Sequence, residues 1–435
     1  MPGPGRLRTP ATVAGLVLAL GLASGSTAPG ALAAPSAWRF DGAGYGHGIG
    51  MSQYGAYGMA RRGVSAARIV SFYYGGAQAR PATLPPELRV GLLQAGRDPR
   101  AGGRLARILV RGVPVPGFSG SGVIRVSGFA TSGRVHTRHL AGNVTWSIRP
   151  EAGGTSVFDP FGRRVFGPTR RGAGVVVRYR GGAGRPALLQ LPQTGHQLRW
   201  GRLEVNRVTD ERGVARPRAV AVLPFNGYLR GLGEMPGSFS MEALKAQAIA
   251  ARSYALYAVL ARGQHGGAGG WDGCDCAVFG DVRDQYYAGY AKETGTDGRR
   301  WVAAVHATRT LVVRVGGRVV QAFYSSSSGG YTSSNAQWGS ARRPEFPSRP
   351  DPDDRAGGRN PNHRWTVRLS AATVSDSLRG YGVGTVLAMR ETRVASWGYR
   401  VSAVRVRGTR KTVTLTGAQL RAALGLKSTK FLISP

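Results

Sequence analysis

One glutamate in this sequence of 435 residues has neighbours that suit acid catalysis. Glu234 lies in the segment YLRGLGEMP, residues 228–236, among glycines and next to a proline. A loop of this composition can hold a lone carboxyl group against apolar neighbours, which keeps the group protonated and able to donate. Donation to a glycosidic oxygen is the chemistry that such a carboxyl group would support. On its own, the same loop more often carries a satisfied or exposed carboxylate.

The segment after this loop predicts a helix with basic groups at fixed spacing. It begins near Ser240, which fits as the N-cap, and Glu242 in the first turn suits the helix dipole. Lys245 and Arg252 are seven residues apart, two turns along one side, so we expect them to project together. On periodicity alone, a surface helix with two solvated cations is the stronger interpretation. The face expected to pack inward carries Leu244, Ala248, Ala251 and Ala255.

Two more segments carry polar groups that suit a sugar. Residues 46–56 read GHGIGMSQYGA, and His47 between glycines can approach a sugar or another backbone closely, although most such glycines merely shape a turn. Further along, Ser326 and Ser327 belong to a serine run that precedes Gly329–Gly330. The hydroxyls of this run suit the hydroxyl and acetamido groups of a carbohydrate, but the run is equally consistent with a polar loop.

Charge and the first residues bound the class of partner. The formal net charge of +37 favours nucleic acid, anionic lipid or the phosphate- and carboxylate-rich polymers of a bacterial wall. Arg6 and Arg8 precede an apolar stretch over residues 11–23, and small residues follow, so residues 1–34 are typical of a cleaved signal peptide. Export favours the cell envelope over DNA. A permanent membrane anchor is the alternative, although the apolar stretch is short for a bilayer.

The chain has two cysteines, Cys274 and Cys276. In an exported protein a disulfide is allowed, but one intervening residue makes a small, strained ring. A free pair and half of a metal site therefore stay open as alternatives. Zinc usually needs four ligands and seven histidines are present, so we predict no cofactor and keep the two cysteines as weak zinc candidates.

The pattern along the chain predicts an α+β fold, with mixed sheets, a few helices around a substrate cleft, and a β-rich module. Residues 81–200 hold short β-branched runs between Gly, Pro and Ser clusters, which is typical of consecutive strands. Residues 35–80 form the Gly-His-Gly segment, interpreted as a permuted part of the main domain. Residues 201–435 form the rest of that domain.

Local signals place the helices and a hairpin near these motifs. Residues 52–61 and 65–74 suit two short helices, each with a serine that fits as its cap. Residues 310–315 and 318–323 alternate as strands around a Gly-Gly turn.

The last hundred residues predict a loop and then regular structure. Residues 342–363, rich in Pro, Arg and Asp, are expected to form a long surface loop. A strand, a helix over 370–378, two strands and a helix over 416–424 closed by Gly425 are expected to follow.

Together these stretches resemble the stage II sporulation protein D family, which includes the amidase-enhancer wall proteins. The likeness covers most of the mature chain outside parts of residues 90–200. Its motifs are the Glu234 loop, the helix EALKAQA with AARSYA after it, the serine run through Thr332, the segment GLKST near the end, and the Gly-His-Gly segment through Gln53. Each motif is moderate evidence for the family, and the set is highly specific.

The resemblance implies a lytic transglycosylase that acts on peptidoglycan glycan strands, typically strands without stem peptides. The family's catalytic glutamate falls on Glu234 and its helix arginine on Arg252. Glu234 would protonate the oxygen between N-acetylmuramic acid and N-acetylglucosamine, and the muramic 6-hydroxyl would attack to leave an anhydro sugar. Because a raised pKa requires desolvation to outweigh nearby cations, we expect Arg252 to hold substrate rather than to contact Glu234. The other residues assigned to substrate are Lys245, His47, Gln53, Ser326, Ser327, Gly329 and Gly330.

Three departures from the family pattern stand out. The link before Glu234 is short, and the cysteine spacing is short, with Asp275 where some members carry a histidine. The Gly-His-Gly segment opens the mature chain, whereas in the family it usually follows the segment matched here by residues 425–431. This order resembles a circular permutation, which requires the start near Phe40 to lie beside the end near Phe431.

Two other classes of protein remain open. One is a non-catalytic wall-binding protein that enhances a separate cell-wall amidase, and the other is a basic extracellular scaffold. In each case we expect a secreted or wall-bound protein whose partners are peptidoglycan glycan strands and anionic wall polymers rather than nucleic acid.

Overall fold

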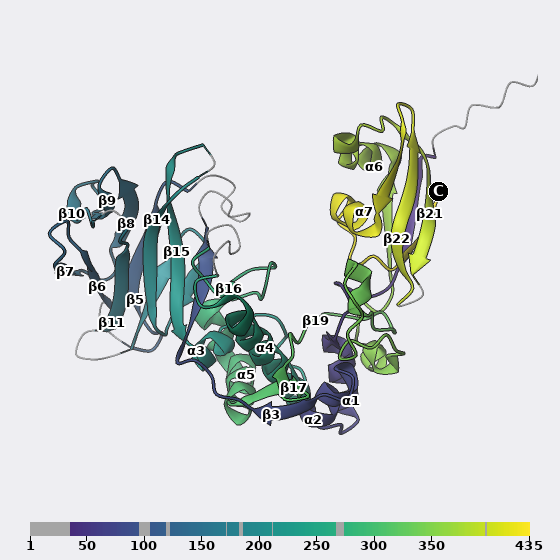
Figure 1. The fold of residues 1–435 in the computed structure, drawn as a ribbon, viewed down its shortest axis with the longest axis horizontal. Helices are drawn as coiled ribbons and strands as arrows, with labels where there is room; N and C mark the ends of the chain where they lie inside the picture. Colours follow the sequence, from purple (N-terminus) through teal and green to yellow (C-terminus); the bar gives the residue numbers. More distant parts are fainter. Residues whose placement is uncertain are drawn as a thin grey trace, which may run out of the picture.

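A computed structural model describes residues 35–94, 105–118, 122–170, 172–181, 186–210, 212–266, 274–395 and 398–435. The predicted signal peptide, residues 1–34, lies outside these ranges. Figure 1 shows a β-rich lobe and a C-terminal lobe that stand on either side of a base of helices. The predicted α+β class with several mixed sheets is confirmed.

The β-rich lobe consists of two sheets. One has the strand order β10-β9-β8-β5-β12-β13 and the other β16-β4-β15-β14-β11-β6-β7. Strand β6 shows why the sequence forms them: its Ile124 and Val126 are buried while Arg125 between them is exposed, which is the period of two that a sheet with one buried face needs. The strands are β4 (Glu87–Leu93), β5 (Ile108–Pro114), β6 (Gly122–Phe129), β7 (Val135–Leu140), β8 (Thr145–Glu151), β9 (Gly154–Phe158), β10 (Arg164–Phe166), β11 (Val175–Gly181), β12 (Ala187–Leu191), β13 (His196–Leu198), β14 (Arg202–Thr209), β15 (Ala215–Pro224) and β16 (Val278–Phe279).

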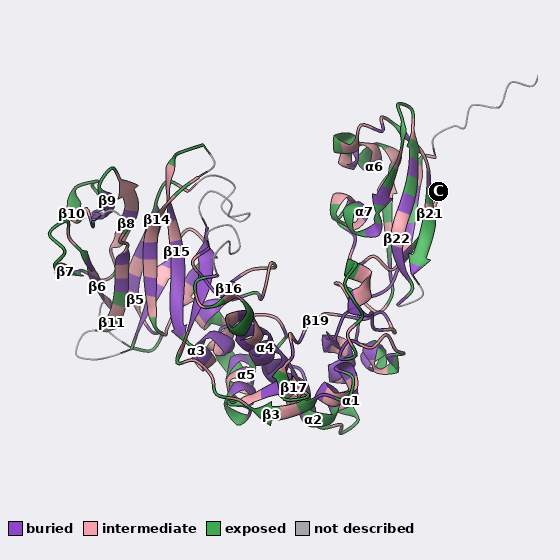
Figure 2. Ribbon diagram, viewed as in Figure 1, coloured by how far each residue is buried: buried purple, intermediate pink, exposed green. Residues whose placement is uncertain are grey.

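The helical base is organised around α4 (Met241–Arg262), which is buried on nearly every side rather than on the single predicted face. Figure 2 shows this helix largely in the buried colour. Alanines along it let neighbouring helices approach closely, so burial does not follow an amphipathic stripe. Around it lie α1 (Gln53–Arg61), α2 (Ala66–Tyr73), α3 (Phe225–Arg230), α5 (Gly295–Ala307), the 3-10 turns η3 (Gly289–Glu293) and η4 (Asn335–Trp338), and the short strands β2 (Met51–Ser52), β3 (Gln78–Pro81), β17 (Leu311–Val315), β18 (Arg318–Val319) and β19 (Tyr324–Ser325).

The predicted caps and hairpin near the base are confirmed. The Ser52 hydroxyl accepts a hydrogen bond from the Gly55 amide at the start of α1, and Ser65 stands at the N-cap of α2 without a side-chain bond. Strands β17 and β18 pair around the predicted turn, Gly316–Gly317, where both glycines have positive φ.

The C-terminal lobe has its own hydrophobic core, separate from that of the rest of the chain. The predicted strand and both predicted helices are present, and the second helix carries a capping box at Thr416 and a left-handed Gly425 at its end. A third strand, β23, was not predicted. The elements are β20 (Trp365–Ser370), α6 (Ala371–Ser377), η6 (Arg379–Tyr381), β21 (Val386–Ala395), β22 (Arg400–Gly408), β23 (Thr412–Thr416), α7 (Gly417–Leu424) and β24 (Phe431–Ser434).

The predicted contact between the start near Phe40 and the end near Phe431 is confirmed. Strand β1 (Ala37–Gly42) lies between β20 and β24 in one sheet, and its Gly42 is opposite Phe431. The rings of Phe40 and Phe431 meet edge to face with centroids 6.1 Å apart. Strand β1 therefore completes the sheet of the C-terminal lobe, as a circular permutation requires.

The predicted loop over residues 342–363 is largely irregular, as expected, but the prediction that it lies wholly at the surface is wrong. The segment contains the 3-10 helix η5 (Pro352–Gly358), and the side chains of Asp351 and Asp354 within it are fully buried. Hydroxyl and amide groups from other segments satisfy both carboxylates, which the composition of the loop could not indicate.

Among the described residues, every helix is too short or too polar to cross a membrane.

We expect Phe40→Ala to destabilise the C-terminal lobe by about 3 to 5 kcal/mol, because it removes a fully buried ring from that core. Arg39→Ala, in the same strand but exposed, should cost less than about 1 kcal/mol. Urea unfolding of both variants measures the difference. Equal effects would mean that β1 is not part of the folded lobe.

Candidate active site

Glu234 lies in the connection between α3 and α4, and the glycines before it are there for close packing. The amide of Gly233 donates to the Tyr286 carbonyl at 2.9 Å, and Leu232 forms a β-bridge with Tyr287. A Cβ at Gly231 would lie 2.3 Å from the Tyr287 ring, and one at Gly233 would lie 2.6 Å from the Tyr286 ring. Only glycine at these positions lets both rings lie against the loop.

The Glu234 carboxyl group is half-buried, with one strong hydrogen bond. Its Oε1 accepts from the amide of Tyr286 at 2.5 Å. Burial raises the pKa of Glu234 to about 7, and the hydrogen bond from Tyr286 opposes that rise. Burial, and next the negative charge of Glu234, raise the pKa of Tyr324 well above its usual value, so this hydroxyl close to Glu234 stays protonated.

This arrangement suits a proton donor. A carboxyl group with a pKa of about 7 is protonated in about half of the molecules at neutral pH, and its conjugate base is ready to take a proton back. Burial and the Tyr286 amide account for the shift, with no contribution from a second carboxylate or a cation among the described residues. Among the residues that the structure describes, the pKa of Glu234 is therefore set without the second carboxylate that a closely spaced pair in a glycoside hydrolase would supply.

Gln53 reaches this loop from the other end of the sequence. Its Nε2 donates to the backbone carbonyl of Glu234 at 2.9 Å and to the Oε1 of Gln247 at 3.3 Å. The side chain is 6 % exposed. Gln53 was predicted to bind substrate, but in this structure it holds the backbone of the Glu234 loop.

Arg252 is not placed where a substrate can touch it. The residue is completely buried, and burial lowers the pKa of its guanidinium to about 9. The guanidinium donates to the carbonyls of Leu311 and Val305 at 3.0 and 3.1 Å, which ties α4 to the end of α5 and the start of β17. The predicted substrate contact is replaced by a structural one.

Lys245 does not project beside Arg252, as the spacing had suggested. It is partly exposed and pairs with Glu242 one turn earlier, at 2.7 Å. The seven-residue spacing gave a common side of the helix, but a helix buried all round has no single exposed side on which the two cations could meet.

The serine run and the double glycine surround a buried carboxylate. The Oγ of Ser327 donates to both carboxylate oxygens of Asp354, at 3.0 and 2.8 Å, and the amide of Gly329 donates to it at 3.1 Å. Ser327 and Gly329 were predicted to bind substrate, but both are buried and serve this carboxylate. Ser326 and Gly330 are half-buried, and Ser326 accepts from the Tyr54 amide through its carbonyl, at 3.1 Å.

His47 is a packed, neutral histidine. Its Nδ1 accepts from the Ile49 amide at 3.0 Å, and its ring meets those of Phe323 and Trp338 edge to face. Burial, and then the positive charge of Arg400, lower the pKa of His47 to about 3. The glycines around it give close approach, since a Cβ at Gly48 would lie 2.1 Å from the Arg400 guanidinium.

Cys274 and Cys276 form a disulfide buried against Val220 and Phe279. In this oxidised form neither sulfur can ligate zinc. Asp275 between them accepts a hydrogen bond from Arg89 at 2.8 Å, which secures the cysteine loop to β4.

Sequence reasoning missed Tyr286 and Asp354. Tyr286 supplies its amide rather than its side chain, so its residue type carried no signal. Asp354 could have been suspected from the four consecutive hydroxyls of Ser325–Ser328, which need a buried acceptor or solvent, but nothing local paired it with them.

The family comparison matches this part of the chain. Residues 215–314 match the model of the family described as Stage II sporulation protein, SpoIID, and they include Glu234, α4 and α5. The resemblance to the SpoIID family predicted from the motifs is therefore confirmed over these residues.

Two curated relatives from Bacillus subtilis (strain 168) are similar to the chain. The protein named Amidase enhancer is 34 % identical over 137 residues, which cover 32 % of this chain and 16 % of that protein. The protein named Stage II sporulation protein D is 28 % identical over 223 residues, which cover 49 % of this chain and 61 % of that protein. The chain thus spans less than two thirds of each of these relatives. No solved structure gives a significant match.

Arg252→Met should lower the free energy of unfolding by about 3 kcal/mol or more, because it leaves buried carbonyls without donors. Lys245→Met in the same helix should cost less than about 1 kcal/mol, as expected for a partly exposed ion pair. Thermal unfolding of both variants tests the structural role. An Arg252→Met protein of normal stability that no longer binds glycan would instead restore the predicted substrate contact.

The raised pKa of Glu234 also makes a prediction about stability. In the folded protein the pKa of Glu234 is about 7, whereas its usual value is 4.5. The fold therefore favours the protonated side chain, and the stability that this protonated form provides is complete below pH 4.5 and is lost as the pH rises through 7. Glu234→Gln should therefore gain stability relative to the native protein between pH 5 and 8, by roughly 2 kcal/mol.

The matched control is Glu242→Gln, for which the expected change in stability has the opposite sign. Hydrogen bonds, of which that from Lys245 is the strongest, outweigh burial and lower the pKa of Glu242, so its carboxylate stabilises the fold above its usual pKa. This variant should lose stability relative to the native protein over the same pH range. Melting temperatures from pH 5 to 8 decide, and a flat difference for Glu234→Gln would show that Glu234 is ionised at neutral pH.

Proposed function

We propose that this protein cleaves peptidoglycan glycan strands between N-acetylmuramic acid and N-acetylglucosamine, as a lytic transglycosylase with Glu234 as its acid. The observation that carries the proposal is the half-buried carboxyl group of Glu234, which has a pKa of about 7 and accepts a hydrogen bond from one backbone amide. Similarity to the SpoIID family and to the proteins named Amidase enhancer and Stage II sporulation protein D supports it.

The reaction needs one group that gives a proton and takes one back. Glu234 donates its proton to the bridging oxygen, and the bond from that oxygen to C1 of the muramic acid breaks with its electron pair on the oxygen. The 6-hydroxyl of the same muramic acid attacks C1 and passes its proton to the Glu234 carboxylate. The products are a free N-acetylglucosamine hydroxyl and a 1,6-anhydro end, and no water is consumed.

The surroundings of Glu234 support both halves of this cycle. Burial favours the neutral acid at the start, and the amide of Tyr286 stabilises the carboxylate after donation. The hydrogen bond from Gln53 to the Glu234 backbone fixes the direction of the side chain, which a donor needs within hydrogen-bond reach of a bridging oxygen.

In this proposal the chain is exported with removal of residues 1–34, and it works at the cell wall on glycan strands without stem peptides. Its net charge of +37 increases its concentration at anionic wall polymers, since a uniform positive field attracts them without a specific pocket. No cofactor takes part.

A second function is favoured by one specific observation, the similarity to a protein named Amidase enhancer. In that case the chain binds the wall and increases the activity of a separate amidase, and Glu234 cleaves nothing. Both functions require binding to the wall, so only the products of digestion distinguish them.

Glu234→Gln should reduce the formation of anhydro-muramic ends by about 100- to 10,000-fold, because an amide cannot donate the proton that general acid catalysis requires. The assay is mass spectrometry of stem-peptide-free glycan after digestion. The control is Glu242→Gln, which removes a nearby carboxylate from the helix that follows the Glu234 loop and should keep normal turnover. Equal turnover by Glu234→Gln would exclude its role as the acid, and no anhydro ends with the native protein would favour the amidase-enhancing function.

A further inference from the structure

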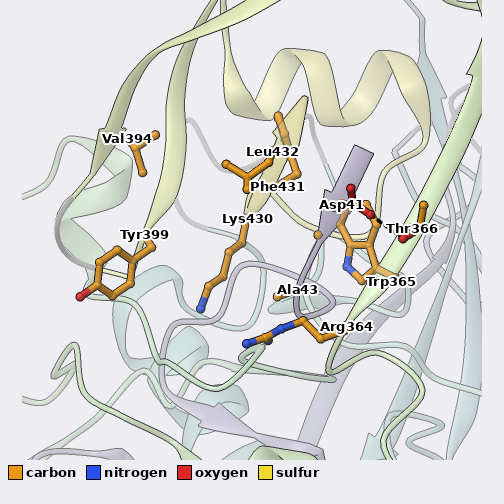
Figure 3. A pocket seen from close by; sticks show the side chains of 11 residues that line it. Asp41, Ala43, Arg364, Trp365, Thr366, Val394, Tyr399, Lys430, Phe431 and Leu432 are labelled. Carbon is orange, nitrogen blue, oxygen red and sulfur yellow. Dashed lines mark hydrogen bonds between the residues drawn. The ribbon is translucent and has the colours of Figure 1, made fainter. Parts of the chain in front are cut away.

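A second candidate site lies in the C-terminal lobe. A cavity of about 750 Å³ opens there between β1, β20, β24, Val394 of β21 and Tyr399. Figure 3 shows the ends of Lys430 and Arg364 pointing toward one another, with Tyr399 to one side and Leu432 beside Phe431. None of its lining residues belongs to the Glu234 loop, so it is a separate site.

The two cations in this cavity lack a counter-ion. Lys430 Nζ and Arg364 Nη1 both donate to the carbonyl of Gly329, at 3.1 and 3.0 Å. Among the described residues, no carboxylate forms a salt bridge with either side chain. Two cations that share one neutral acceptor repel each other and still have donors to offer, and a bound anion would relieve this repulsion.

The protonation of Lys430 reflects this repulsion. Burial, followed by the charges of Arg400 and Arg364, lowers the pKa of Lys430 to about 8. The buried Asp354 and Asp351 act in the opposite direction but less strongly. The ammonium group is therefore charged at neutral pH in a place that disfavours its charge.

The walls of the cavity are apolar and aromatic. Trp365 is 8 % exposed, and its indole N–H donates to the Gly44 carbonyl at 2.8 Å. Trp365 therefore offers only carbon surface to the cavity. Leu432 is 69 % exposed and Tyr399 is 58 % exposed, so both side chains can contact a ligand that has a flat apolar face.

Tyr399 is held in place at a cost. Its backbone has a φ of +52°, a left-handed conformation that bulky residues rarely adopt. Its ring meets that of Tyr331 edge to face at 5.3 Å, and the Lys430 ammonium lies 6.0 Å from both ring centres. Strained residues persist where the surroundings fix them, and they concentrate at ligand sites.

We propose that this cavity binds a saccharide ring that carries a carboxylate, with the carboxylate on Lys430 and Arg364 and the ring against Tyr399 and Leu432. The aromatic and apolar walls favour a sugar ring over a polyol phosphate chain, which has no comparable apolar face. The one carboxylate in the lining, Asp41, does not compete for the cations, because Thr366 donates to it at 2.6 Å and Arg39 pairs with it at 2.8 Å.

The site deepens the proposed function, on which it rests for the identity of the ligand. A glycan strand without stem peptides exposes one lactyl carboxylate on each muramic acid, which is the chemistry that the cavity selects. The cavity would therefore hold the strand outside the Glu234 site.

The test is a titration of the full mature chain that carries Glu234→Gln, so that nothing is cleaved. The probes are N-acetylmuramic acid, N-acetylglucosamine, which lacks the carboxylate, and glycerol phosphate, which supplies an anion without the ring. Isothermal calorimetry should detect N-acetylmuramic acid and at least tenfold weaker binding of the other two.

Four variants locate the binding. Lys430→Gln should weaken it about tenfold, the usual loss for one charge-assisted hydrogen bond, and Lys430→Arg should retain it. Tyr399→Ala should weaken it about fivefold through loss of ring contact. Lys411→Gln removes the same charge from an exposed position in the same lobe and should change affinity less than twofold.

Several results would overturn the site. Equal losses in Lys430→Gln and Lys411→Gln would reduce the effect to net charge, and equal binding of glycerol phosphate or N-acetylglucosamine would exclude a carboxylated sugar as the ligand. Melting temperatures exclude misfolding as the cause of lost binding. Because the titration does not depend on turnover, its outcome is independent of whether native Glu234 yields anhydro ends.

Discussion

The arrangement of the helical base depends on the hydrogen bonds that surround the buried carboxylate of Asp354. It accepts hydrogen bonds from the Ser52 hydroxyl, the Ser327 hydroxyl, the Gly329 amide, the Asn360 amide group and the ring of His363. Burial alone would raise its pKa, but these bonds, with that of His363 the strongest, hold the pKa below its usual value. An ion without water is stable only if donors surround it, so three segments far apart in the sequence must meet at this point.

The hydrogen bonds of Asp354 also connect it to the candidate active site. Ser52 caps α1, and the next residue, Gln53, holds the backbone of Glu234. On the other side, Gly329 donates its amide to Asp354 while its carbonyl accepts from Lys430 and Arg364 in the second cavity. The same short loop thus supports the helix that carries Gln53 and also positions the two cations of the proposed saccharide site.

The contrast between two buried carboxylates explains why one can be reactive and the other structural. Asp354 has donors on both oxygens and stays ionised. Glu234 has one amide and a half-buried position, so its pKa rises to about 7. The number of donors, rather than burial, decides which of them can exchange a proton near neutral pH.

The sequence alone determined the parts of this protein that depend on local pattern. Alternation in residues 122–126 gave the strand β6, the serines before α1 and α2 gave their starts, and the Gly-Gly pair gave the hairpin, because side-chain period and turn geometry act over a few residues. The motif set also indicated the family, which the match over residues 215–314 confirms.

Which charged side chains are exposed to water depended on the tertiary structure. Arg252 was buried and Lys245 left at the surface although both share one helix, and Asp354 became a core residue within a segment of loop composition. The reason is that the cost of burying a charge is set by donors and acceptors from distant segments, and no window of the sequence contains both partners.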